Sequence, residues 1–97
     1  NLADHASQSG ALLKTLLADA LADKPGVKEV RGVGLLLAIE LEKPCGELVM
    51  KAADKGLLIN VTADTVVRLL PPLVTSESEI RDIATRLIPL VEEFLNT

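Results

Sequence analysis

Aromatic residues are almost absent from this chain of 97 residues, because Phe94 is the only one. Protein surfaces that stack on nucleobases need aromatic rings, and this chain has almost none to supply. Positive charge is also scarce, since 10 Lys and Arg residues stand against 14 Asp and Glu residues and the formal net charge is −4. An acidic chain repels a phosphate backbone. The composition therefore argues against a nucleic-acid partner.

Cysteine and histidine are each represented once, by Cys45 and His5. A single cysteine cannot form an internal disulfide, and one His far from one Cys in sequence lacks the spacing of a metal site. A nucleophilic thiol needs a neighbouring base to activate it, and no other imidazole is present. We therefore expect no metal ligand and no catalytic thiol. The cysteine content suits the reducing environment of the cytoplasm.

Long hydrophobic runs are missing as well. The longest apolar run without a charge extends from Val33 to Ile39 and is too short to cross a bilayer. The N-terminal residues lack the basic segment and hydrophobic core of a signal peptide. These features argue against a membrane protein. The chain begins with Asn1 instead of methionine, so we expect it to be part of a longer protein.

Apolar residues are abundant in spite of these absences, at 48% of the chain with a mean hydropathy of +0.35. A chain of this length supports one hydrophobic core. The sequence contains no internal repeat and no low-complexity linker. We therefore expect a single domain over residues 1–97, in which a leading helix over 1–24 precedes a sandwich over 27–97.

The sequence predicts three helices. Leucine and alanine recur at spacings of three and four through the first third, and this helix must end before Pro25-Gly26. A second helix is predicted over residues 47–55, followed by Gly56 at the position after the C-cap. Ser76 and Glu79 form a capping-box pattern at the start of the last helix, in which we expect a kink near Pro89.

Short apolar segments between these helices predict four strands, over residues 27–30, 35–41, 57–61 and 65–70. Pro71-Pro72 ends the last strand, because proline lacks the amide donor that a sheet requires. The predicted order is α-β-β-α-β-β-α. This order favours an α+β fold, a small two-layer sandwich with a short, mainly antiparallel sheet and helices on one side.

Gly32-Val33-Gly34 has the first two glycines of a dinucleotide-binding loop. The third glycine is missing because Leu37 stands in its place, and the motif begins a strand where the loop would begin a helix. We interpret these glycines as residues that permit close packing or a bulge at the start of a strand.

Arg68 is the charged residue with the most apolar neighbours, in the segment Val66-Val67-Arg68-Leu69-Leu70. Strand alternation places its side chain on the same face as Val66 and Leu70. An unpaired guanidinium in such surroundings is costly, so we expect Arg68 to bind an anion. Its planar fork suits a carboxylate. The residues alone leave open whether that carboxylate belongs to the protein or to a ligand.

Three segments of the sequence resemble the small C-terminal domain of class III aminotransferases. They are Val27–Leu36, Gly56–Val61 and Val67-Arg68-Leu69-Leu70-Pro71-Pro72-Leu73 followed by the capped helix. The order and spacing of these blocks match that family up to Leu95, and the leading helix also matches. Within the class, the sequence most resembles the members that act on acetylornithine, followed by those that act on ornithine or succinylornithine.

The resemblance implies a pyridoxal-phosphate enzyme that moves an amino group between an acetylornithine-like amino acid and 2-oxoglutarate. Arg68 matches the arginine that binds the substrate carboxylate in this family. No lysine here matches the Schiff-base motif, and neither the phosphate-binding loop nor the aspartate that contacts the cofactor nitrogen is present. The resemblance therefore implies that the large domain binds pyridoxal phosphate, that the intact enzyme is a homodimer, and that this fragment alone is inactive.

Two other functions remain open at this point. A free-standing regulatory module would bind a small amino acid by itself and would need Arg68. A plain interaction domain would associate tightly with itself and would be indifferent to the substitution Arg68→Ala.

Overall fold

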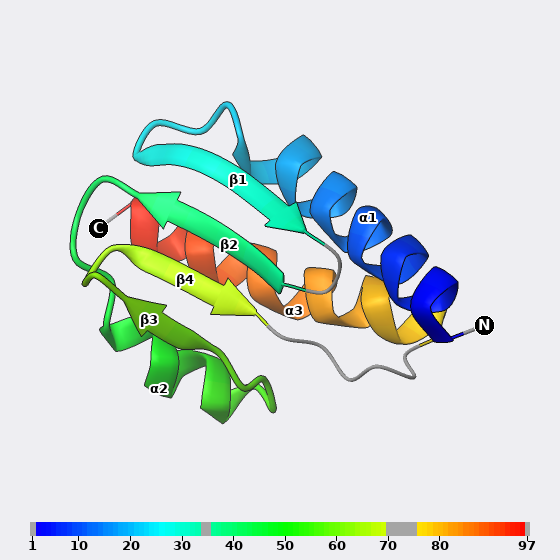
Figure 1. The fold of residues 1–97 in the computed structure, drawn as a ribbon. Coiled ribbons are helices and arrows are strands. Elements are labelled where there is room, and N and C mark those ends of the chain that lie inside the picture. Colours follow the sequence, from blue (N-terminus) through cyan, green and yellow to red (C-terminus); the bar gives the residue numbers. More distant parts are fainter. Residues whose placement is uncertain (1, 34–35, 70–75, 97) are drawn as a thin grey trace.

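The fold was determined as a computed structural model, which describes residues 2–33, 36–69 and 76–96 (Figure 1). The order of elements is α-β-β-α-β-β-α, as the sequence predicts. The elements are α1 Leu2–Leu21, β1 Val27–Val33, β2 Leu36–Leu41, α2 Glu47–Asp54, β3 Asn60–Thr62, β4 Val66–Leu69 and α3 Glu77–Leu95.

The strands form one four-stranded sheet in the order β1-β2-β4-β3, and every neighbouring pair is antiparallel. Strand β2 therefore lies between β1 and β4, and β4 lies between β2 and β3 (Figure 1). Strands β2 and β4 are hydrogen-bonded along both edges, which makes them the most constrained part of the sheet.

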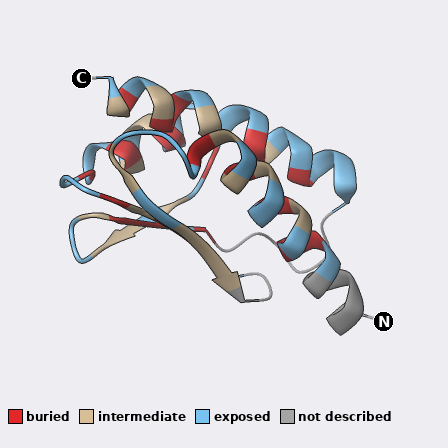
Figure 2. Cartoon of the chain, turned by 90° about the horizontal axis from the view of Figure 1, so that it is seen from above, coloured by how far each residue is buried: buried red, intermediate tan, exposed pale blue. Residues whose placement is uncertain are grey.

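The helices form a second layer on one face of the sheet (Figures 1 and 2). Helices α1 and α3 pack against each other, α1 also contacts β1, and α2 lies against α3 and the edge strand β3. The predicted α+β sandwich with an antiparallel sheet is thereby confirmed. No helix in the described residues is long and apolar enough to span a membrane.

The core lies between the sheet and the helices. Alternate residues of β2, namely Leu37, Ile39 and Leu41, are buried, and Val67 and Leu69 of β4 share their face. Their fully buried partners on the helices are Leu13, Leu17, Leu21, Ile80, Leu87 and Val91. Burial of an aliphatic side chain of this size contributes about 1.5–3 kcal/mol, so this face supplies most of the driving force for folding.

Strand β1 is longer than predicted, because it continues through Gly32 to Val33. Gly32 pairs with Leu37, and a Cβ atom at this position would collide with the Leu37 side chain. The interpretation of this glycine as a close-packing residue is therefore confirmed. The register shift in this strand pair lies at the other end, between Val27 and Glu29.

Strand β3 is shorter than predicted and begins only at Asn60. The amide of Leu57 donates to the carbonyl of Ala52 at 2.8 Å, and that of Gly56 donates to Ala53 at 3.0 Å. These two bonds close the end of α2, with Gly56 in a left-handed conformation at φ +78°. The predicted role of Gly56 is confirmed, and it explains why Leu57 belongs to the helix end and not to the sheet.

The end of α1 and the start of α3 can both be compared with the predictions. Helix α1 ends at Leu21, before the predicted limit near Pro25, and a turn follows. Helix α3 begins with the predicted capping box: the Ser76 hydroxyl accepts from the Glu79 amide at 3.2 Å, and the Glu79 carboxylate accepts from the Ser76 amide at 3.2 Å. The helix continues through Pro89 to its end. Residues 70–75, including the paired prolines, lie outside the described part of the chain.

Candidate functional site

The face of the sheet opposite the core is not covered by any described segment, and we call it the outer face (Figure 1). Direct cross-strand pairs place four residues in one row on this face: Arg31 of β1, Ala38 of β2, Arg68 of β4 and Asn60 of β3. Neighbouring strands are about 4.8 Å apart, so adjacent side chains in this row lie close to one another.

Arg68 is exposed, although the residues on either side of it, Val67 and Leu69, are buried at 0% and 4% exposure. The alternation along β4 explains this contrast, since Val67 and Leu69 point to the core and Arg68 points to the outer face. Because β4 is paired on both sides, the backbone of Arg68 has a fixed position.

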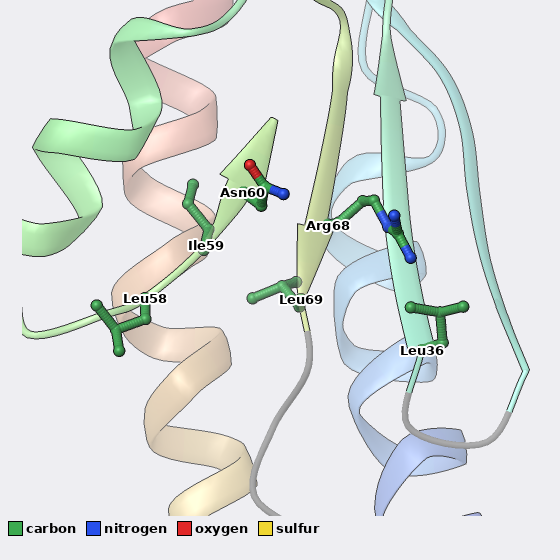
Figure 3. Close-up of a pocket in the computed structure, with 6 residues that line it drawn as sticks. All are labelled: Leu36, Leu58, Ile59, Asn60, Arg68 and Leu69. Carbon is green, nitrogen blue, oxygen red and sulfur yellow. The ribbon is translucent and has the colours of Figure 1, made fainter. Parts of the chain in front are cut away.

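No carboxylate among the described residues forms an ion pair with Arg68. Its side chain extends from β4 over β2 towards Leu36 (Figure 3). The methyl group of Ala38, directly opposite on β2, leaves room for the guanidinium to lie there. The sequence left open whether the carboxylate that binds Arg68 belongs to the protein or to a ligand. The described part of the chain supplies no such carboxylate, so Arg68 is available to an external anion.

Two open hollows flank Arg68. One has a volume of about 400 Å³ and lies between Arg68, Asn60, Leu36 and Leu58 (Figure 3). The other, of about 420 Å³, extends over Ala38 towards Arg31. Leu58 is 91% exposed, so the first hollow has an apolar rim as well as a charged wall. This combination suits a small organic anion.

Arg31 lies on the same face but has quite different surroundings. Its Nη1 donates to Glu40 Oε1 at 2.8 Å and to Glu29 Oε1 at 3.1 Å. The hydrogen bond that Arg31 donates to Glu40 is the main reason that the pKa of the Arg31 guanidinium lies above its usual value. With two carboxylates already bound, this arginine is occupied, and Arg68 remains the better site for an additional anion.

Asn60 lies directly opposite Arg68, although no motif in the sequence marks it as a site residue. Its Oδ1 accepts a hydrogen bond from the Val61 amide at 2.9 Å. The pairing depends on the turn between β3 and β4, in which Ala63 and Asp64 both have positive φ values of 50° and 65°. The position of a hairpin turn determines which residues of its two strands are paired. This turn is therefore the local signal in the sequence that places Asn60 opposite Arg68.

Cys45 is fully buried, and burial raises the pKa of its thiol. A protonated, inaccessible thiol is a poor nucleophile. Its backbone amide donates to the carbonyl of Asp64 at 2.8 Å, so the segment before α2 is tied to the turn between β3 and β4. Within the described ranges, no group of three His, Cys, Asp or Glu side chains comes together to hold a metal ion.

Comparison with known proteins identifies similar sequences along almost the whole chain. The family described as aminotransferase class-III matches residues 1–91. Acetylornithine aminotransferase 1 of Bordetella pertussis is 53% identical over 94 residues, which are 97% of this chain and 24% of that protein. Acetylornithine aminotransferase of Methanosarcina acetivorans is 40% identical over 79 residues, which are 81% of this chain and 20% of that protein.

Solved structures give the same result for the fold. An ornithine aminotransferase from Toxoplasma gondii superposes with a TM-score of 0.86 at 39% identity, over 99% of this chain and 24% of that one. An ornithine δ-aminotransferase from Plasmodium falciparum gives a TM-score of 0.90 at 30% identity, over 99% of this chain and 26% of that one. The chain thus spans about a quarter of the length of the relatives it matches.

Proposed function

Because this chain belongs to the class III aminotransferase family, we propose that it is the C-terminal small domain of an acetylornithine aminotransferase and that Arg68 binds the substrate carboxylate. In this proposal residues 1–97 form one domain, with a leading helix over 1–24 and a sandwich over 27–97. The observation that carries the proposal is an exposed guanidinium that pairs with no carboxylate of the described residues and lies beside two open hollows.

Acetylornithine and 2-oxoglutarate both carry a carboxylate, so the same guanidinium suits the amino donor and the amino acceptor. A planar guanidinium donates two parallel hydrogen bonds to a carboxylate and thereby fixes its orientation as well as its position. A hydrogen bond to a charged group is worth about 1.5–3 kcal/mol. Arg68 would use this energy to hold the carboxylate of the substrate at a fixed place, which orients the rest of the molecule.

Pyridoxal phosphate supplies the electron sink for transamination when it is bound. No lysine lines either of the two hollows beside Arg68. Lys24 pairs with Glu92 and Lys51 with Glu47, both on the helical layer. We therefore propose that the cofactor and all catalytic residues belong to the large domain of the same enzyme, and that the 97-residue chain alone has no transaminase activity.

The test is a substitution of Arg68 in the full-length holoenzyme. Arg68→Ala should lower kcat/KM for acetylornithine by about tenfold to a hundredfold or more, because a charge-assisted bidentate contact is lost. Arg81→Ala is the matched control, since Arg81 is exposed on α3, where it pairs with Glu77, and lines neither hollow beside Arg68. Equal activity of the Arg68→Ala and Arg81→Ala enzymes would refute the proposal.

A substrate analogue makes the same test specific for the carboxylate. Acetylputrescine has the acetyl group and amine of acetylornithine but no carboxylate. The unmodified enzyme should prefer acetylornithine strongly, and Arg68→Ala should remove most of that preference. Preference unchanged by the substitution would mean that the carboxylate is bound elsewhere. Binding of acetylornithine to the 97-residue chain alone, with Arg68 required, would instead favour a free-standing regulatory module.

A further inference from the structure

Asn60 is the side chain that faces Arg68 most directly from the neighbouring strand. The two residues form a cross-strand pair between β3 and β4, and both are exposed on the outer face. They also line the same hollow of about 400 Å³. In a direct antiparallel pair the two Cβ atoms are about 4.5–5.5 Å apart, so one small ligand can touch both side chains.

The orientation of the Asn60 amide is fixed by a hydrogen bond. Its oxygen accepts from the Val61 backbone amide at 2.9 Å, so the oxygen is engaged within its own strand. The nitrogen then carries the free hydrogen-bonding capacity, in the form of two N–H donors. Figure 3 shows this nitrogen on the side of the amide that faces β4 and Arg68. The pair thus presents donors alone to the hollow.

Two N–H donors beside a guanidinium suit an oxyanion, because a carboxylate accepts about four hydrogen bonds through its two oxygens. An arginine fork satisfies two of these positions, which leaves others for a neutral donor on the next strand. None of the described carboxylates competes for the two donors, since the only hydrogen bond that the Asn60 side chain makes in that part of the chain is the one from Val61.

We propose that Asn60 is a second binding residue for the carboxylate at Arg68, and that its amide nitrogen donates to the oxygen on the β3 side. This inference rests on the proposed function of Arg68 and adds a residue to the same site. The Val61 amide has a part in it, because it holds the Asn60 oxygen and so turns the nitrogen towards the ligand. Asn60 therefore favours a carboxylate over a group that presents hydrogen-bond donors.

The decisive variant is Asn60→Asp in the full-length holoenzyme. Aspartate keeps an oxygen that accepts from the Val61 amide, so a purely structural role is retained. The N–H donors, however, are replaced by a negatively charged oxygen that repels the ligand and competes for Arg68. Binding of glutarate, an unreactive dicarboxylate, is measured by isothermal titration calorimetry at constant ionic strength. The dissociation constant should rise by about a hundredfold or more, since a favourable charge-assisted contact becomes a repulsive one.

Asn60→Ala removes the donors without adding charge and should raise the glutarate dissociation constant by about tenfold. The matched control is Asn96→Ala, because Asn96 lies at the C-cap of α3 and lines neither hollow beside Arg68. Circular dichroism melting of each variant separates loss of binding from loss of folding. A KM for 2-oxoglutarate that rises with little change in kcat would support a role in binding.

The results separate this inference from the proposed function. If Arg68→Ala weakens glutarate binding and both Asn60 variants match Asn96→Ala, the inference is wrong and the function of Arg68 stands. If Arg68→Ala leaves binding unchanged, the proposed function itself fails. A double variant, Asn60→Ala with Arg68→Lys, should weaken binding by less than the product of the single effects, because both residues contact one carboxylate. Independent effects would contradict a shared ligand.

Discussion

The two faces of the sheet are built from the same strands but have opposite chemistry. On the inner face, Leu37, Ile39 and Val67 are at most 1% exposed and belong to the hydrophobic core that the helices complete. On the outer face, Ala38 and Arg68 alternate with them along the same strands. The inner face is filled by its own helices, whereas the outer face is left open by the described residues. Alternate residues of one strand therefore have different roles: those on the inner face stabilise the fold, and those on the outer face are available for binding.

The two arginines of the outer face also differ from each other. Arg31 is held by Glu29 and Glu40, while Arg68 has no described carboxylate partner. Both residues are arginines on one face and in one row of the sheet, so residue type alone does not distinguish them. In the next row of the sheet, Glu29 precedes Arg31 by two residues on β1, whereas Val66 occupies that position before Arg68 on β4. The Arg31 guanidinium contacts Glu29 and Glu40, whereas the Arg68 side chain extends towards Leu36 (Figure 3).

The largest effect is expected from a substitution on the inner face. Ile39→Ala should lower the free energy of unfolding by about 2–5 kcal/mol, because it leaves a cavity in the core. Leu36→Ala is the matched control on the same strand, since Leu36 points outward and is 45% exposed. Urea unfolding of both variants measures the difference. Equal losses for the two would show that the faces do not differ as described.

An intermediate effect is expected from Ala38→Leu on the outer face. The larger side chain would occupy the space into which the Arg68 guanidinium extends, so binding should weaken by about tenfold, which is about 1.4 kcal/mol. Stability should change much less than for Ile39→Ala, because Ala38 is not part of the core. The measurement is the KM of the full-length holoenzyme for 2-oxoglutarate. An unchanged KM would mean that the guanidinium does not use this space.

The smallest effect is expected from Glu40→Gln. This substitution removes the stronger of the two carboxylate partners of Arg31 and returns the pKa of its guanidinium towards the usual value. Since both side chains of this ion pair remain partly exposed to solvent, stability should fall only slightly, and 1 M salt should abolish the difference between variant and parent. Urea unfolding at low and high salt measures this. A large, salt-independent loss would show that the Arg31 cluster supports the core.

The parts of this structure that depend on neighbours in sequence were predictable. The capping box of Ser76 and Glu79 and the left-handed Gly56 both follow from residues within one or two turns of a helix. Arg68 could be selected because its apolar neighbours are adjacent in sequence. The element order and the antiparallel fold class followed from the spacing of these signals.

The features that depend on strand pairing were missed. The start of β3 was misplaced because the Leu57 amide is used by the end of α2, which periodicity does not reveal. The pairing of Arg31 with Glu40 depends on the register of β1 against β2, and that register shifts near Val27. Asn60 could not be selected because its position opposite Arg68 is created by the turn at Ala63 and Asp64.

The central place of β4 has a consequence for motion in the intact enzyme. Hydrogen bonds on both edges prevent this strand from sliding without its neighbours, and the helical layer holds those neighbours in turn. Arg68 therefore cannot approach or leave a reactant by a local backbone shift. A motion that carries this guanidinium would therefore carry the sheet and its helices with it as one rigid body.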